Sequence, residues 1–333
     1  QITFFENKKK NILVRKKLRK YIQQILHYPQ KFFDFKSVLG TSVHYKSDLD
    51  LGEYFSSIGV PYIIFHKEGF FVTKTQQKFV KNIYSKFKQL EADLIFTNNE
   101  ITKKILVKTC CKKIKIKSYG NMIYNKIPKP KKNSKKTITF FSFHYRAGLF
   151  KKKVFEMFGK KGWINLFNES HKTFIETAIS DPKNNYIIKL KWGGEWEDKI
   201  MGIKKEITKN DIPNLKIVSQ ANSFDLINKS NRIVAFNSSA ILESLILRKD
   251  VICLDFEETS KKKYFSQVIH NQFKKYIHVA KSKKKLEELL LKKKLKLKSS
   301  FNSQIRYDTK NYLSTFTGKI VSKKTNRELK KFL

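Results

Sequence analysis

The sequence predicts an α/β protein in which short parallel strands alternate with helices in two domains. Apolar runs of strand length recur along the chain, and amphipathic segments of helical length separate them. Residues 216–256 are the clearest example. We expect buried strands at 216–219, 232–236 and 251–256, with helices at 223–229 and 240–247 between them. Strands joined through helices at this spacing form parallel βαβ units.

The composition favours a folded chain with a large positive charge. The 333 residues are 40% hydrophobic, enough for the cores of two domains and too much for a disordered protein. Lys and Arg outnumber Asp and Glu by 71 to 28, a net charge of +43. A nucleic acid, an anionic membrane surface or an anionic substrate could balance this charge. Because the lysines are spread along the whole chain, we expect no specific nucleic-acid partner.

The cysteines and the hydropathy indicate a cytoplasmic protein. Cys110 and Cys111 are adjacent, which disfavours a mutual disulfide. The third cysteine is Cys253, and the sequence contains no Cys-x-x-Cys motif. No apolar run has the length of a transmembrane helix, and no secretory signal is visible. The chain starts with Gln1 rather than Met, so we interpret it as trimmed or as a fragment.

Residues 1–130 form the expected first domain. Its basic amphipathic start, 1–37, is interpreted either as a membrane-surface helix or as a Lys-rich solvated helix packed on the domain. The strand 60–65 ends at His66 and Glu68. Because ligands bind at the carboxyl ends of strands in open α/β sheets, these two residues are candidate site residues. A solvated turn is the alternative. The other expected elements are strand 37–43, helix 48–58, a helix opened by the capping box Thr73-x-x-Gln76, strand 92–96, helix 101–109 and edge strand 114–117.

Residues 126–136, KIPKPKKNSKK, are the expected linker. They contain two prolines and many lysines but no large core residues. A polybasic contact with phosphate or lipid is the alternative interpretation.

Residues 137–333 form the expected second domain, which includes the C-terminal helices. Its strand 137–143 leads to Arg146, a side chain suited to a phosphate or carboxylate. In strand 186–191, Lys189 and Lys191 alternate with apolar residues, so one Lys-bearing face can point into a cleft. The Gly193-Gly194 loop that follows would permit close backbone approach. Further helices are expected at 168–179, 259–270 and 283–291, and a loop plus a helix at 312–333.

The segment 236–239 is a candidate anion site. There a strand ends and a helix begins, so exposed N–H groups, the helix dipole and the hydroxyls of Ser238 and Ser239 converge. Glu243 follows about one turn into the helix. The alternative is that the two serines only cap the helix.

The order of these features resembles the GT-B glycosyltransferases, and in particular capsule and surface-polysaccharide enzymes of the CDP-glycerol transferase-like or Kdo transferase-like type. The resemblance is carried by Asn237-Ser238-Ser239-x-x-x-Glu243 with Val251-Ile252 after it, by the segments 59–62 and 66–69, and by 92–100. The family usually has Ala, Gly and Pro where Ser244, Arg248 and Asp250 stand. The resemblance implies two Rossmann-like domains that face a central cleft, with a nucleotide-sugar donor on the second domain. It assigns donor phosphate to Ser238 and Ser239 and the ribose to Glu243. The other donor-binding candidates are Arg146, Lys189, Lys191 and Asn237.

The expected function is therefore sugar transfer from a nucleotide-activated donor to a glycan or lipid-linked glycan in surface-polysaccharide assembly. Glu68, with His66 second, is the candidate base for the acceptor hydroxyl. No metal and no cofactor are expected, and the protein would be cytoplasmic or peripheral on an anionic membrane face. A nucleotide-sugar 2-epimerase or polyol-phosphate transferase on the same fold is one alternative. The other alternative is a non-catalytic protein. It would bind polyanions or membranes, or it would be a degenerate GT-B protein.

Overall fold

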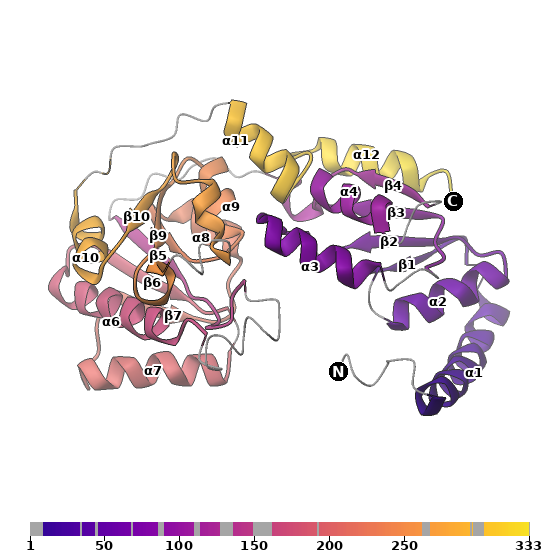
Figure 1. Ribbon diagram of the computed structural model, residues 1–333, viewed down its shortest axis with the longest axis horizontal. Coiled ribbons are helices and arrows are strands. Elements are labelled where there is room, and N and C mark those ends of the chain that lie inside the picture. The colour runs from indigo at the N-terminus through magenta and orange to yellow at the C-terminus, as the bar shows by residue number, and fades with distance from the viewer. Residues whose placement is uncertain are drawn as a thin grey trace. The chain divides into compact units, whose positions relative to one another are not determined.

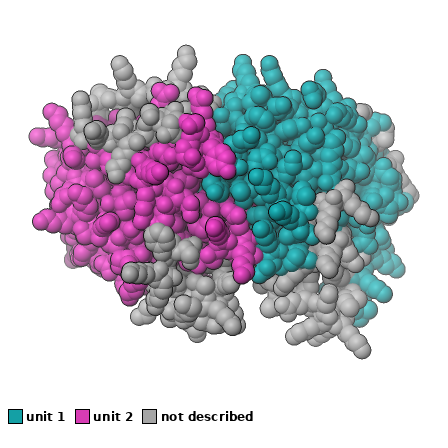
Figure 2. Space-filling model, turned by 45° about the horizontal axis from the view of Figure 1, so that its top comes forward, with its two compact units in different colours: residues 1–70, 80–126, 310–333 teal, residues 71–79, 127–309 magenta. Residues whose placement is uncertain are grey.

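The computed structural model forms two compact units (Figures 1 and 2). Unit 1 comprises residues 1–70, 80–126 and 310–333, and unit 2 comprises 71–79 and 127–309. The described residues are 9–33, 35–43, 46–67, 69–85, 90–109, 114–126, 136–148, 162–191, 193–261, 267–293, 295 and 303–332. Cys110, Cys111 and most of the expected linker (127–135) lie outside them.

Unit 1 contains a parallel four-stranded sheet in the order β1-β2-β3-β4. The inner strands β2 and β3 are the apolar runs, whereas β4 is the edge strand that the alternation of Lys and Ile predicts. The elements are α1 (Lys9–Phe32), β1 (Val38–Gly40), α2 (Lys46–Ser57), β2 (Tyr62–His66), α3 (Lys74–Tyr84), β3 (Leu94–Thr97), α4 (Glu100–Thr109), β4 (Lys115–Ser118), the 3-10 turn Met122–Tyr124 and α12 (Ile320–Leu329). The first residues of α3 are grouped with unit 2.

Unit 2 contains a parallel six-stranded sheet in the order β10-β9-β8-β5-β6-β7. The chain runs outward from the central β5 to β7, and then returns to the other side of β5 for β8, β9 and β10 (Figure 1). Its elements are β5 (Thr137–Phe141), α6 (Ile164–Ser180), β6 (Asn185–Lys189), α7 (Glu195–Ile207), β7 (Leu215–Val218), α8 (Ser223–Lys229), β8 (Arg232–Ala235), α9 (Ala240–Ile246), β9 (Asp250–Leu254), the 3-10 turns Glu257–Ser260 and Ile269–Gln272, β10 (His278–Ala280), α10 (Lys283–Leu291) and α11 (Ser303–Asp308). All residues of β5 and β8 are buried, as the central position requires. This two-unit α/β architecture confirms the expected fold class.

The C-terminal segment belongs to unit 1, which corrects the expected second domain of 137–333. The backbone N–H of Thr315 donates to the carbonyl of Asn98 at 2.9 Å, and the Asn99 side chain donates to the carbonyl of Tyr312 at 3.0 Å. The hydroxyls of Ser118 and Thr315 are also hydrogen-bonded. The C-terminal segment therefore satisfies polar groups at the carboxyl ends of β3 and β4, a pairing that no local sequence pattern encodes.

Two local sequence signals are confirmed. Thr73 and Gln76 form the reciprocal capping box, with Gln76 N donating to Thr73 Oγ1 at 3.2 Å and Thr73 N to Gln76 Oε1 at 3.0 Å. Gly59 has φ +71° just after α2, the left-handed conformation that ends many helices.

Two expectations about unit 2 are wrong. The expected helix 259–270 is absent from its described residues, which lie in or beside the 3-10 turns Glu257–Ser260 and Ile269–Gln272. The strand expected as buried at 216–219 is a half-exposed edge strand. In addition, helix α7 follows directly after Gly194, which has φ +63°, at residues where the Gly193-Gly194 pair predicts a loop.

Candidate functional site

The carboxyl edge of the unit 2 sheet holds the candidate site. The strand order reverses between β5 and β8, and the crevice beyond the strand ends at such a switch point is where open α/β sheets bind ligands. The two loops that flank this point, 142–148 after β5 and 236–239 after β8, are in direct contact. Asn237 Nδ2 donates to the carbonyl of Ala147 at 3.0 Å.

Asn237 fastens three loops at this edge. Besides Ala147, its Nδ2 donates to the carbonyl of Gln267 at 3.2 Å, and its Oδ1 accepts the Ile269 N–H at 2.9 Å. Its φ of +45° turns the chain between β8 and α9, and a Cβ at Gly148 would come within 2.6 Å of its Nδ2. Asn237 is one of the donor-binding residues predicted from the sequence, and that contact stays a prediction. In the structure its side chain positions the surrounding loops.

The turn 144–148 is held firmly by backbone and indole groups. Trp163 donates from its backbone N–H to the carbonyl of Tyr145 at 2.6 Å and from its indole to that of Ala147 at 2.7 Å. The Arg146 N–H donates to His144 Nδ1 at 2.9 Å. Since this nitrogen is an acceptor, the neutral His144 ring carries its proton on Nε2.

Aromatic rings and cations gather at this turn, and we call them the carboxyl-edge cluster. It comprises His144, Tyr145, Arg146, Lys191, Trp196 and Lys199. The His144 ring centroid lies 4.6 Å from that of Tyr145 and 4.3 Å from that of Trp196. Arg146 lies over the Tyr145 ring at 5.2 Å, and the Lys199 ammonium lies 4.5 Å from the Trp196 ring.

The cations of the cluster keep His144 neutral. Its pKa is lowered to about 4 by partial burial and by the charges of Arg146, Lys191 and Lys199. Three positive groups thus act on one ring beside the switch point. An anion bound there would offset their mutual repulsion.

The start of α7 limits where an anion fits. Glu195 pairs with Lys199 at 2.5 Å, and Glu197 and Asp198 also lie in the first turn of the helix. These carboxylates disfavour an anion at that helix end.

The two serines of the predicted motif differ in their side-chain contacts. Ser238 Oγ accepts the Ala240 N–H at 3.2 Å and so acts as a helix cap, whereas Ser239 makes no side-chain cap bond. Helix α9 has only seven residues, so its dipole contributes little and the cations dominate the electrostatics. Glu243 is 6% exposed in the structure, so little of its surface is accessible to a ribose.

Two residues that depart from the family motif lie between the end of α9 and the start of β9. Arg248 follows α9 with φ +54°, the left-handed conformation for which Gly is usual. Asp250 starts β9 in place of the family's Pro.

Lys189 does not join the cluster. Its ammonium donates to the carbonyls of Leu190 and Ser219, each at 2.7 Å, and burial lowers its pKa. It joins the ends of β6 and β7. Lys191, two residues on, is exposed, and its charge contributes to the lowered pKa of His144.

In unit 1 the structure does not favour His66 as a base. The ring is 1% exposed, its Nδ1 accepts the Val43 N–H at 3.4 Å and its Nε2 lies 2.9 Å from the Tyr84 hydroxyl. Both nitrogens are therefore occupied by structural bonds. Glu68, the other candidate base, lies outside the described residues.

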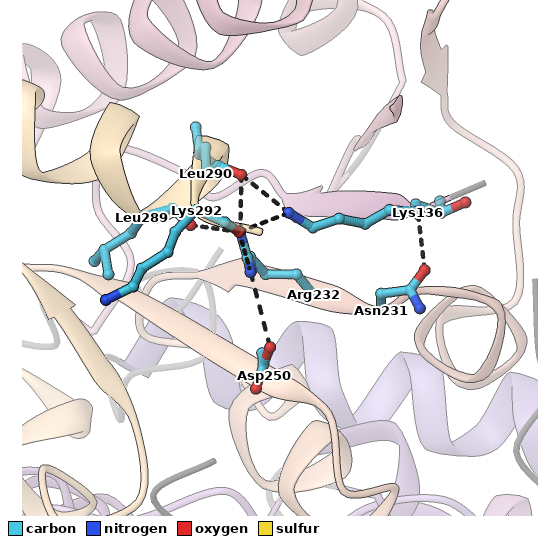
Figure 3. Close-up of polar contacts among 8 residues, drawn as sticks. Lys136, Asn231, Arg232, Asp250, Leu289, Leu290 and Lys292 are labelled. Atoms are coloured by element: carbon cyan, nitrogen blue, oxygen red, sulfur yellow. Dashed lines mark hydrogen bonds and ion pairs between the residues drawn. The ribbon is translucent and has the colours of Figure 1, made fainter. Parts of the chain in front are cut away.

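A second basic cluster lies at the amino edge of the same sheet (Figure 3). Arg232 is 1% exposed and donates to the carbonyls of Leu289 at 2.5 Å, Leu290 at 2.8 Å and Lys292 at 3.0 Å. Lys136 donates to the carbonyls of Leu290 and Lys292 at 3.3 and 3.1 Å. We call Arg232, Lys136 and Asp250, which lies 3.9 Å from Arg232, the amino-edge cluster. These cations cap the C-terminal end of α10.

No group of three His, Cys, Asp or Glu in the described ranges is arranged to hold a metal ion. None of the described helices is both long and apolar enough to cross a membrane.

His144, Tyr145, Trp196 and Lys199 were not assigned to the site from the sequence. Trp196 and Lys199 lie on α7, where the Gly193-Gly194 pair predicts a loop. The signal was present, because Trp196, Ile200 and Ile203 are buried at helical spacing.

Solved structures share the fold, although no protein-family model and no curated protein matches the chain significantly. The wall teichoic acid polymerase TagF gives a TM-score of 0.52 at 13% identity, over 82% of this chain and 69% of that one. A UDP-GlcNAc 2-epimerase from Neisseria meningitidis bound to UDP-GlcNAc gives 0.51 at 12% identity, over 95% and 81%. A putative UDP-N-acetylglucosamine 2-epimerase from Listeria monocytogenes gives 0.51 at 11% identity, over 94% and 76%. The chain has the GT-B type of fold, with two Rossmann-like domains.

Proposed function

We propose that the chain binds a nucleoside-diphosphate sugar at the carboxyl-edge cluster and transfers the sugar to a glycan or lipid-linked glycan. The observation that carries this proposal is the carboxyl-edge cluster beside the switch point, where Arg146 lies over the Tyr145 ring and Lys199 over the Trp196 ring. Together with Lys191, these cations lower the pKa of His144. Such a group of cations suits a diphosphate, and stabilising the departing diphosphate is the main electrostatic task of glycosyl transfer. In support, the Neisseria epimerase of the same fold is bound to UDP-GlcNAc.

The groups on the page suggest a division of roles. Arg146 can donate two parallel hydrogen bonds to phosphate oxygens, and Lys191 adds a second charge. The rings of Tyr145 and Trp196 offer flat surfaces to a base or sugar. Because these cations can stabilise the leaving group, we propose a reaction without a metal or cofactor. Glu68 remains the proposed base.

The biological setting is proposed from the resemblance. The wall teichoic acid polymerase of the same fold is, by its name, an enzyme of a surface polymer. We accordingly propose surface-polysaccharide assembly in the cytoplasm.

Donor binding can be tested by thermal unfolding with UDP-, GDP-, CDP- and CMP-sugars. A donor present at a hundred times its Kd should stabilise the folded chain by about 2.7 kcal/mol. Stabilisation by one nucleotide class, lost in Arg146→Met, supports the proposal. Equal stabilisation by inorganic polyphosphate and by every nucleotide would contradict it and indicate simple polyanion binding.

A 2-epimerase is the second candidate, because two of the similar structures are described as such enzymes. The two functions differ in their need for an acceptor. An epimerase converts the nucleotide sugar into its 2-epimer with no acceptor present, whereas a transferase releases the nucleotide only when an acceptor is added. Analysis of both products by mass spectrometry and NMR separates them.

A further inference from the structure

Helix α1 carries an apolar face that the described part of the chain leaves exposed. The face consists of Val14, Tyr21, Ile25, Tyr28 and Phe32, whose exposed fractions range from 41% to 77%. Their spacing (i, i+7, i+11, i+14, i+18) keeps them on one side of the helix. A soluble protein rarely exposes a contiguous row of large apolar side chains unless another surface covers it.

The same helix has many basic residues and no acidic ones. No Asp or Glu occurs between Lys9 and Phe32. Its basic residues are Lys9, Lys10, Arg15, Lys16, Lys17, Arg19, Lys20 and Lys31. Among them Lys16, Lys17 and Lys20 are exposed. Positions 9 and 10 lie in the first turn, at the positive end of the helix dipole, where lysines are unfavourable unless an anionic surface compensates them.

We propose that α1 binds an anionic lipid surface, lying in its plane. An interfacial helix has aromatic and aliphatic residues on one face and Lys or Arg elsewhere, and α1 has both features within 24 residues. Tyr21 and Tyr28 suit the boundary between headgroups and acyl chains. None of the described helices is apolar enough to span a membrane, so α1 would rest on the surface.

A second copy of the chain is a poorer occupant of this face. Pairing two copies through α1 would bring two basic helices without acidic residues together, and their charges would repel. Anionic headgroups supply the complementary charge instead. The peripheral position of α1 in unit 1 leaves the helix accessible (Figure 1).

Vesicle sedimentation tests the proposal with the full chain. We expect binding to vesicles of phosphatidylcholine with phosphatidylglycerol, little binding to phosphatidylcholine alone, and weaker binding as salt increases. The triple variant Ile25→Ser, Tyr28→Ser, Phe32→Ser should bind at least about tenfold more weakly. The matched control, Gln23→Ser with Gln24→Ser, alters exposed polar positions of the same helix and should bind like the wild type.

A charge variant tests the electrostatic part. Replacing Lys16, Lys17 and Lys20 by Gln should weaken binding to the anionic vesicles roughly a hundredfold, or about fivefold per lysine. Circular dichroism and the thermal transition establish that each variant is folded. The proposal is overturned if the wild type does not bind anionic vesicles, or if the serine triple variant binds as well as the control.

Light scattering without lipid tests whether a second copy of the chain covers the α1 face. A dimer that the serine triple variant dissociates, together with no vesicle binding, would show that a second copy covers the face and would overturn the proposal. These measurements need no nucleotide sugar, so their failure is distinct from a failure of the proposed function.

Discussion

Two groups of basic side chains lie at opposite edges of one sheet in unit 2, and their surroundings differ. In the amino-edge cluster, Arg232 is buried and its guanidinium donates to backbone carbonyls of α10 (Figure 3). In the carboxyl-edge cluster, Arg146 is exposed and lies over an aromatic ring. Moving a cation away from buried carbonyls leaves those carbonyls without hydrogen-bond partners. A cation that lies over a ring can bind a ligand at a low cost in free energy. Basic residues in this Lys-rich chain therefore differ in role by the groups they contact, not by their charge.

The largest expected effect is at the amino edge. Arg232→Met should lower the free energy of unfolding by about 3 kcal/mol, because it leaves carbonyls of α10 and the Asp250 carboxylate without their buried partner. The same change at the other edge, Arg146→Met, should alter stability by less than about 0.5 kcal/mol. Urea unfolding of both variants measures the difference. If the two variants are equally destabilised, the comparison fails.

The reverse should hold for ligand binding. The double variant Arg146→Met, Lys191→Met should weaken binding of the preferred nucleotide sugar about ten- to hundredfold, because each change removes a charge-assisted contact. Calorimetric titration gives the affinity. Arg232→Met, measured well below its unfolding temperature, is the control and should keep the wild-type affinity. A double variant that binds normally would place the donor elsewhere.

Asn237 connects the two properties, because it is structural yet lies at the site. Asn237→Gly keeps the φ of +45° but removes the side-chain bonds to Ala147, Gln267 and Ile269, so it should lose about 1–2 kcal/mol of stability. Asn237→Ala should lose about 1 kcal/mol more, since Ala disfavours positive φ.

A positioning role predicts more than instability. Asn237→Gly should also weaken donor binding at temperatures where the variant is fully folded. Ser230→Ala is the matched control, because it removes a buried bond to Thr139 (2.6 Å) in the same unit, away from the cluster. If both variants retain donor affinity, Asn237 only stabilises the fold.

The sequence predicts most strands and several helices correctly, because the signals are local. The capping box at Thr73 and Gln76 and the helix Ser223–Lys229 are examples. Arg146 is predicted as a site residue because it follows an apolar strand, and Lys189 and Lys191 are predicted because they alternate with apolar residues in another strand. This alternation cannot distinguish Lys191 from Lys189, whose ammonium bonds to the carbonyl of Ser219, thirty residues away. The return of the C-terminal segment to unit 1 likewise depends on contacts between distant residues.

The smallest expected effect near neutral pH is the response of His144 to pH. Its pKa is lowered from 6.5 to about 4, so the unfolded chain takes up a proton more readily than the folded one. The stability that His144 contributes is complete above about pH 6.5 and is lost as the pH falls through about 4. A bound diphosphate would offset the charges of Arg146, Lys191 and Lys199 and so raise the pKa of His144. Donor binding should then take up a proton, and affinity should increase as the pH falls from 6.5 towards the pKa of the free protein. NMR titration of the His144 ring with and without UDP, assigned with His144→Gln, measures this shift. An unchanged pKa at saturating UDP would mean that the phosphates bind away from the carboxyl-edge cluster, and the contrast between the two edges would then concern stability alone.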